Sequence, residues 1–292
     1  MPLPIRLIRA NNPSPLTGTG TNSYIVGQGE VAVVDPGPDL DSHLAALVAA
    51  LDPGERITRI LLTHAHLDHS ALVPRLAAVT GAQVLAFGSA TAGRSATMTR
   101  LAAEGLKGDE GADPDFAPDQ TLRDGDSVAL GDHLITAVHL PGHMGCHMGF
   151  ALGDVLLSGD HVMDWSSTLV SPPDGDMAAY MASLHLLAGR QWSRFWPGHG
   201  PAVTDPARRL DDLIRHRLAR EAAILAALRQ HGPSTAAALA ARIYTDTPPH
   251  LLGAATRNVL AHLIDLSDRA CVSPATNPTQ TPLAHAAFHA PD

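Results

Sequence analysis

The chain has 292 residues, which suffice for one large domain and a smaller one, and its core must be mainly aliphatic because 45% of the residues are hydrophobic and only 4% are aromatic. Two cysteines do not make a disulfide framework. No apolar run approaches the roughly 20 residues that cross a bilayer, and residues 1–15 contain no apolar segment of a secretory signal. We therefore expect a cytoplasmic protein without membrane contact.

The formal net charge of −9 is unevenly distributed. Residues 1–205 carry 11 Lys and Arg against 22 Asp and Glu, whereas residues 206–271 carry nine arginines against six acidic residues. An acidic surface disfavours non-specific attraction to nucleic acid over most of the molecule. The mildly basic second segment keeps that attraction as an alternative.

Up to about residue 201, short β-prone runs alternate with segments of helical spacing. Gly27-Gln28-Gly29 separates two β-prone runs and predicts a hairpin. Residues 108–120 are acidic, rich in Gly and Pro and without periodicity, which predicts a surface loop. Two packed sheets covered outside by helices account for this alternation. The patterns predict helices at 39–51, 69–79 and 177–188, and strands at 24–26, 31–34, 57–62, 83–87, 127–130, 134–140, 147–152 and 154–157.

The composition changes at Thr204-Asp205-Pro206, where Asp is a preferred helix cap and Pro a preferred first helical residue. Leucine and isoleucine then recur at helical spacing as far as about residue 232, and shorter helices are expected at 234–243 and 251–266. Three helices followed by a β-prone pair at 271–272 resemble a small winged-helix or helix-turn-helix module. We therefore divide the chain into a catalytic domain (1–205), a winged-helix-like helical domain (206–272) and a tail without a core of its own (273–292).

The segment Thr63-His64-Ala65-His66-Leu67-Asp68-His69 places four metal-competent side chains in six residues, directly after a predicted buried strand. Alternate side chains of an extended segment point the same way, so His64 and His66 can bind one ion. Asp68 and His69, on the turn that follows, are then free to reach a second ion. Imidazoles with a carboxylate suit zinc or another first-row metal in a hydrolytic centre rather than a thiolate structural site.

Three later turns each place one more candidate ligand at the end of a β-prone run. These turns are Pro141-Gly142-His143, Ser158-Gly159-Asp160 and Pro197-Gly198-His199-Gly200. Glycine beside each ligand lets the backbone turn sharply and approach an ion closely. Each turn alone is weak evidence, but three of them after the histidine-rich segment predict a metal site. His147 either orients His143 through a hydrogen bond or faces solvent.

His64-x-His66-x-Asp68-His69, followed in order by His143, Asp160 and His199, resembles the full metal signature of the metallo-β-lactamase superfamily. The resemblance covers residues 19–200 and implies an α+β fold, a four-layer αβ/βα sandwich with a dinuclear site at one edge. Zinc is the metal that this family uses most often, and iron and manganese occur with the same ligands. The resemblance implies that His64, His66 and His143 hold one divalent ion, that Asp68, His69 and His199 hold another, and that Asp160 bridges them.

Three further segments resemble one branch of this superfamily, whose members carry a C-terminal winged helix and are similar to the mitochondrial β-lactamase-like endoribonuclease and its bacterial relatives. They are 20–24 (Gly-Thr-Asn-Ser-Tyr), 172–176 (Pro-Pro-Asp-Gly-Asp) and His216-Arg217-x-x-Arg220-Glu221. The basic hairpin expected after the last helix is replaced by the uncharged residues 273–281, which argues against nucleic-acid contact there. Candidate substrate-binding residues lie in segments that resemble rim loops of the branch, with turn capping or core packing as the alternative: Asn22, Thr168 and Tyr180.

These motifs predict a metal-dependent hydrolase in which a metal-bridging hydroxide attacks an ester, thioester, lactone or phosphodiester. Asp68 is the expected catalytic residue, because it can orient or deprotonate the nucleophile while it binds a metal. The alternatives are an endoribonuclease acting on single-stranded RNA, a weak or promiscuous β-lactamase, and a DNA- or partner-binding regulator that uses Arg257, Asn258 and His262 of the last helix. The expected partners are a small-molecule or single-stranded RNA substrate, with a homodimer as an alternative assembly.

Overall fold

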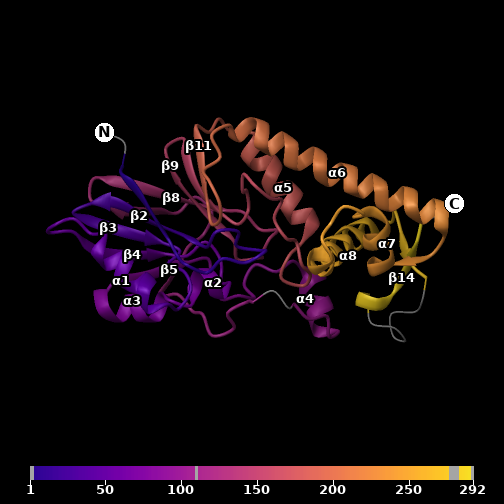
Figure 1. Cartoon of the computed structure of the whole chain (residues 1–292), viewed down its shortest axis with the longest axis horizontal. Helices are drawn as coiled ribbons and strands as arrows, with labels where there is room; N and C mark the ends of the chain where they lie inside the picture. Colours follow the sequence, from indigo (N-terminus) through magenta and orange to yellow (C-terminus); the bar gives the residue numbers. More distant parts are fainter. Residues whose placement is uncertain (1–2, 109–110, 276–282, 291–292) are drawn as a thin grey trace.

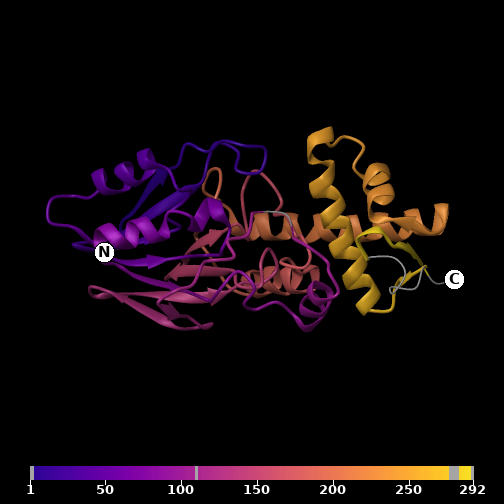
Figure 2. The same ribbon diagram turned by 90° about the horizontal axis from the view of Figure 1, so that it is seen from below.

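The computed structural model describes residues 3–108, 111–275 and 283–290. Two β-sheets with helices on their outer faces form the larger part of the molecule, and a smaller, mainly helical part lies beside it (Figure 1). The long helix α6 (Pro206–His231) runs along both parts (Figure 2). No helix within the described ranges is both long and apolar enough to cross a membrane.

The first sheet has six strands in the order β1-β2-β3-β4-β5-β6. The predicted hairpin is confirmed, because β2 and β3 pair antiparallel with Tyr24 opposite Val34. Strands β3 to β6 are parallel, and Ile57, Ile60 and Leu61 of the central β4 are buried. The strands are β1 (Ile5–Arg9), β2 (Asn22–Gln28), β3 (Glu30–Val34), β4 (Arg56–Leu61), β5 (Gln83–Ala86) and β6 (Gln120–Thr121).

The second sheet has five strands in the order β11-β10-β9-β8-β7. Its neighbours are antiparallel except β10 and β11, which are parallel. The four strands predicted between residues 127 and 157 are confirmed in number and order. The strands are β7 (Ser127–Leu130), β8 (His133–His139), β9 (Met148–Leu152), β10 (Val155–Gly159) and β11 (Arg194–Pro197).

The two sheets pack face to face through a mainly aliphatic core that contains Phe150. Helices α1 and α3 cover the outer face of the first sheet through Leu47 and Leu76. Helix α5 covers the outer face of the second sheet through Leu184. This arrangement confirms the predicted four-layer αβ/βα sandwich of the α+β class. The helices are α1 (Asp41–Ala49), α3 (Val73–Thr80) and α5 (Met177–Ala188).

The predicted helix at 69–79 is two shorter helices, of which the first is α2 (Leu67–Ser70) and the second is α3. Pro74 lies in the first turn of α3, where its missing N–H costs no hydrogen bond, so it favours a new helix over a continuous one. Gly81 ends α3 with a φ of 69°, the left-handed conformation that helix ends often require. The break lets α2 present Asp68 and His69 at the sheet edge.

A second core joins α6 to the C-terminal helices. Asp205 caps α6 as predicted, because its side chain accepts a hydrogen bond from the Arg208 backbone at 3.1 Å. The first half of α6 packs against α5, and its second half packs through Leu228 against α7 and α8. The sequence did not reveal α4, whose Met98 also enters this core. The helices are α4 (Ala96–Ala103), α7 (Ala236–Ile243), the 3-10 turn η1 (Pro249–Leu251) and α8 (Leu252–Asp268), which together with α6 confirm a winged-helix-like domain.

The described part of the predicted tail belongs to this domain. Strand β14 (Ala287–His289) pairs with both β12 (Ser234–Thr235) and β13 (Ser273–Pro274), after a single 3-10 turn, η2 (Leu283–His285). Phe288 is fully buried in the second core. Residues 283–290 of the predicted tail therefore pack into the core of the helical domain, because Phe288 fills space between its helices. Most of the uncharged segment 273–281 lies outside the described residues.

Candidate metal centre

The seven predicted ligands meet at one edge of the sandwich. His64 and His66 follow β4, His143 follows β8, Asp160 follows β10 and His199 follows β11. These five ligands are therefore carried by the segments that follow four strands, and the other two, Asp68 and His69, lie on α2. Their ligand atoms form three groups, each with all of its atoms within 4.8 Å of one another: His64, His66 and His143; His64, His69 and Asp160; and Asp68, His69 and His199.

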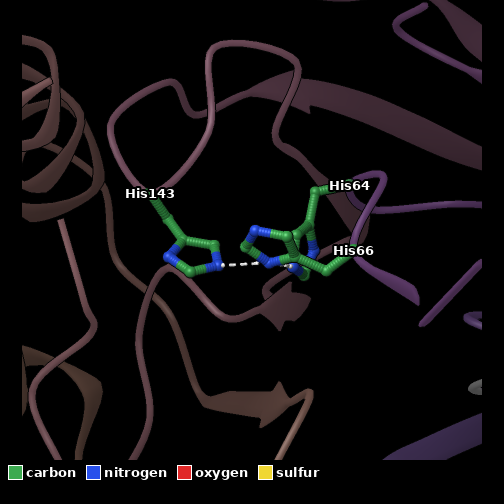
Figure 3. Close-up of side chains that lie close together, drawn as sticks. All are labelled: His64, His66 and His143. Atoms are coloured by element: carbon green, nitrogen blue, oxygen red, sulfur yellow. Dashed lines mark hydrogen bonds between the residues drawn. The ribbon is translucent and has the colours of Figure 1, made fainter. Parts of the chain in front are cut away.

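In the first group, three imidazoles turn ring nitrogens toward one another. Nε2 of His64 lies 2.9 Å from Nδ1 of His66, which lies 3.0 Å from Nε2 of His143. Figure 3 shows His143 reaching from its own loop toward His64 and His66 on the facing loop. Nδ1 of His143 donates to the carbonyl of Leu169 at 2.7 Å, so Nε2 is the ring nitrogen that faces the group.

The other two groups share His69, and Asp160 lies close to ligands of all three groups. Nε2 of His199 lies 3.2 Å from Oδ2 of Asp68 and 3.3 Å from Oδ2 of Asp160. Nε2 of His69 lies 3.4 Å from Oδ1 of Asp160, and Nε2 of His143 lies 3.9 Å from its Oδ2. Asp160 thus lies between the three-histidine group and the group of Asp68, His69 and His199, as a ligand common to two ions would.

Asp35 is a supporting residue that the sequence analysis missed. Its Oδ2 lies 2.9 Å from Nδ1 of His69 and accepts a hydrogen bond from the hydroxyl of Thr63 at 2.8 Å. Its Oδ1 accepts from the Thr63 backbone at 2.8 Å. A proton on Nδ1 of His69 leaves Nε2 as the nitrogen that faces Asp68 and Asp160. The signal was present in the sequence, because Asp35 also follows an apolar strand and precedes Pro-Gly.

The protonation states of His64, His66 and Asp160 suit metal binding. Burial lowers the pKa of His66, and the neighbouring His143 lowers it further, to about 3. Burial and the neighbouring His69 likewise hold the pKa of His64 well below its usual value. Burial alone would raise the pKa of Asp160, but His199 outweighs it and keeps this carboxyl ionised. Neutral imidazoles and ionised carboxylates are the forms that coordinate divalent ions.

Burial lowers the pKa of His69 and His199, but Asp68 and Asp160 outweigh it, so the pKa of His69 lies well above its usual value and that of His199 rises to about 9. An ion that binds these two rings would displace a proton from each.

One buried oxygen tests whether these residues fit a divalent cation. Oδ1 of Asp160 is buried and has no hydrogen-bond partner among the described residues. A buried ionised oxygen is costly unless a donor or a cation compensates for the lost water. A divalent cation between Asp160 and the imidazoles would provide that compensation, and a set of imidazole and carboxylate ligands suits zinc, iron or manganese.

Gly198 allows the two ligand loops to approach each other. A Cβ at this position would lie 2.2 Å from Oδ1 of Asp160 and 2.6 Å from Cε1 of His69. The Gly198 backbone also donates to the carbonyl of Gly159 at 2.9 Å, which ties the loop of His199 to that of Asp160. Glycine at this position therefore lets the backbone lie close to two of the predicted ligands.

The structure places the three candidate substrate-binding residues differently from one another. The Asn22 amide is buried and donates to the carbonyls of Pro197 and Gly200, so it holds the loop of His199. Tyr180 is buried in the core under α5. Neither residue lines the cavity above the ligands, and the prediction that they contact substrate is wrong. Thr168 does line that cavity, and its hydroxyl donates to the carbonyl of Asp160 at 2.5 Å.

His147 has neither of its two predicted roles. It is fully buried, and its Nε2 accepts a hydrogen bond from the backbone N–H of Asp160 at 3.2 Å. Its ring stacks on His64, with ring centroids 5.0 Å apart. His147 therefore supports Asp160 and His64 rather than orienting His143.

A cavity of about 520 Å³ opens above the ligands. Asp68, Asp160 and His199 lie among the residues at its base, and the larger part of the molecule supplies one wall. The opposite wall comes from the C-terminal helices, so residues far apart in sequence enclose one space. The apolar residues of the two walls are Leu16, Leu67, Met163, Trp165 and Leu169 on one side and Tyr244, Leu251, Ala254 and Ala255 on the other.

The residues of α8 that were considered as nucleic-acid contacts face the larger part of the molecule. Nε of Arg257 donates to the hydroxyl of Ser171 at 2.7 Å, and the Asn258 side chain accepts from the Val170 backbone at 3.0 Å. His262 is only 1% exposed. The interpretation of these three residues as nucleic-acid contacts is therefore wrong, because packing between the two parts of the molecule occupies them.

Comparisons with known proteins agree with this geometry. Residues 16–215 match the sequence profile of the metallo-beta-lactamase superfamily, and residues 235–274 match that of the beta-lactamase associated winged helix domain. A crystal structure of a metallo-beta-lactamase family protein from Thermus thermophilus superposes with a TM-score of 0.76 and 25% identity, covering 98% of each chain.

Two other proteins are similar to this chain in sequence. The beta-lactamase-like protein 2 homolog of Caenorhabditis elegans is 28% identical over 257 residues, which are 86% of this chain and 80% of that protein. The atrochrysone carboxyl ACP thioesterase of Aspergillus chevalieri is 30% identical over 233 residues, 77% of this chain and 66% of that protein. The chain spans two thirds or less of the length of such fungal relatives. Because the superfamily profile matches more than half of the chain and the fold agrees, the chain belongs to the metallo-beta-lactamase superfamily.

Proposed function

We propose that this metal-dependent hydrolase is dinuclear and cleaves carboxylic esters, thioesters or lactones. The observation that carries the proposal is the composition of the cavity above the ligands. Its described lining includes the carboxylates of Asp68 and Asp160 and neither lysine nor arginine. A carbonyl substrate needs no cationic side chain to bind, whereas a polynucleotide phosphate backbone does.

The predicted ligands would form two metal sites. His64, His66 and His143 would hold one divalent ion, Asp68, His69 and His199 would hold the other, and Asp160 would be a ligand common to both. Two bound ions, which we propose to be zinc, would supply a nucleophile at neutral pH and polarise the substrate oxygen. Asp68 is the catalytic residue, because its carboxylate lines the cavity and accepts a hydrogen bond from the hydroxyl of Thr21 at 3.3 Å. Burial raises its pKa, but His69 and His199 outweigh this and keep it ionised, so it can orient the attacking water.

A thioesterase among the relatives supports an acyl substrate over the alternatives. Cleavage of single-stranded RNA and weak β-lactam hydrolysis stay alternative activities of the same ligands. A cytoplasmic location and a homodimer likewise stay predictions. We retain Thr168 as a substrate-contact candidate, since it lines the cavity beside the ligands.

The test is a panel of assays with the metal-loaded protein and its Asp160→Ala variant. The panel contains p-nitrophenyl acetate, a lactone, an acyl thioester, bis-p-nitrophenyl phosphate, single-stranded RNA and nitrocefin. We expect turnover of the carbonyl substrates and its loss in the variant. Cleavage of RNA alone, or activity that survives in the variant, would contradict the proposal.

A further inference from the structure

Exposed apolar side chains gather at the mouth of the cavity above the ligands. In the described part of the chain, nine large hydrophobic side chains are strongly exposed, and three of them line this one cavity. They are Leu16 (52% exposed), Leu67 (46%) and Trp165 (43%). Single exposed hydrophobic residues are ordinary, but several around one cavity indicate a surface that a ligand covers.

The facing wall is apolar too, and the C-terminal domain supplies it. Leu251, Ala254 and Ala255, from η1 and the first turn of α8, line the cavity opposite Trp165 and Leu16. Small alanine side chains in the first turn of α8 leave the space that larger residues would fill.

Tyr244 completes this wall, and Arg220 packs against its ring. Tyr244 follows α7, and the guanidinium of Arg220 on α6 lies 4.3 Å from the centroid of its ring. A cation held against an aromatic face restrains the ring. The wall is therefore a built surface that three elements of the C-terminal domain position.

Charge separates the base of the cavity from its walls. Among the described Asp, Glu, Lys and Arg residues, Asp68 and Asp160 line the cavity, both of them predicted metal ligands, whereas the two walls contain none. A volume of about 520 Å³ is within the ordinary range of small-molecule sites. The reacting carbonyl belongs at the polar base, and the group that extends from it meets apolar walls.

We propose that the C-terminal domain is the acyl-binding wall of this enzyme, and that the substrate carries an uncharged, apolar acyl group of several carbons as an ester or thioester. The inference rests on the proposed function, since it assigns the acyl side of the same reaction. The winged-helix-like domain then selects a small molecule by packing against its acyl chain, and it does not bind nucleic acid.

The test uses thioesters of N-acetylcysteamine, whose leaving group is uncharged, with acetyl, butanoyl and hexanoyl chains. Each methylene that is buried is worth roughly a fourfold gain in kcat/KM. We expect hexanoyl to exceed acetyl by at least about tenfold, because only part of the chain is buried. A six-carbon chain that ends in a carboxylate should lose most of this gain. A p-nitrophenyl series with the same acyl groups distinguishes an ester from a thioester preference.

Matched variants on one helix turn locate the wall. Ala254→Leu adds carbon atoms to the cavity and should lower the hexanoyl-to-acetyl ratio at least about fivefold. Gly253→Leu is the control, because Gly253 is exposed, does not line the cavity and would have no heavy atom within 4 Å of an added Cβ. The control should leave the ratio unchanged, and melting temperatures verify that both variants are folded.

Three results would overturn the acyl-wall proposal. They are rates that stay flat or fall with chain length, equal rates for the carboxylate-ended chain, and equal changes of the ratio in both variants. If the acetyl thioester is cleaved in an Asp160-dependent manner while the rates do not change with chain length, the proposed function is supported and the acyl-wall proposal is refuted. If no ester, thioester or lactone is cleaved, both proposals fail.

Discussion

Replacement of Gly198 by alanine should disable the ligand cluster, although alanine can adopt the backbone conformation of residue 198. Gly198 does not have a positive φ, so alanine meets no backbone strain there. The obstacle is space, because the new Cβ would lie 2.2 Å from Oδ1 of Asp160, whereas ordinary contact begins at 3.4 Å. Asp160 cannot turn away freely, since His69, His143 and His199 surround it.

The loop or the carboxylate must therefore shift by roughly 1 Å, and a shift of that size at reacting groups costs on the order of 100-fold in rate. We expect kcat/KM for the best ester or thioester to fall about 100-fold, equivalent to about 2.7 kcal/mol of transition-state stabilisation. The metal content of the purified Gly198→Ala protein should fall as well. Steady-state kinetics and metal analysis measure the two effects.

Gly253→Ala is the matched control. Gly253 also lacks a positive φ, but no heavy atom lies within 4 Å of its added Cβ. Alanine in this helical position should leave activity intact and stabilise the protein by roughly 0.5–1 kcal/mol. The reasoning would be refuted if Gly198→Ala kept its metal and its activity, or if both variants lost activity equally.

Three further predictions concern the C-terminal domain. Asn258→Leu removes the oxygen that accepts from Val170 and Arg217 beside the loop of Leu169, so metal affinity in a chelator competition should fall several-fold. Asn258→Asp keeps that oxygen and should keep the affinity; equal losses would show that the contact does not matter. Burial, and next Arg217, lower the pKa of His262 to about 3, below its value of about 6.5 in the unfolded chain, so His262 costs stability as the pH falls from about 6.5 toward 3. Between pH 7.5 and 5.5, the free energy of unfolding measured by urea denaturation should fall by about 1.3 kcal/mol less for His262→Leu than for the unaltered protein. The same pH dependence in both proteins would contradict this. Phe288→Ala should lower the free energy of unfolding by about 3–5 kcal/mol, whereas a loss below about 1 kcal/mol would mean that β14 adds little to the core.

The metal ligands were predictable because their signal is local. His143, Asp160 and His199 each follow an apolar run and adjoin a glycine, and the first four ligands lie within six residues. Strand ends that carry such turns collect at one edge when the strands run in the same direction, as β10 and β11 do. Asp35 carries the same local signal, but it stands alone without a histidine nearby, so nothing singled it out.

The cavity and its walls were not predictable, because they depend on contacts between distant segments. Polar Asn22 and Tyr180 resemble rim residues in the sequence, yet one holds the loop of His199 and the other fills the core under α5. Arg257 and its neighbours on α8 resemble a nucleic-acid-binding helix until the packing of α8 against residues 168–171 is known. Phe288 was overlooked because one buried aromatic residue has no periodic pattern around it.

The most direct test of the dinuclear centre is the metal content of the protein and of its Asp160→Asn variant. Both are loaded with zinc, iron or manganese, dialysed and analysed by mass spectrometry. Because Asp160 lies between the two groups of ligands, we expect about two ions per chain in the unaltered protein and the loss of at least one in the variant. An unaltered protein that retains no ion, or a variant that retains both, would contradict the account.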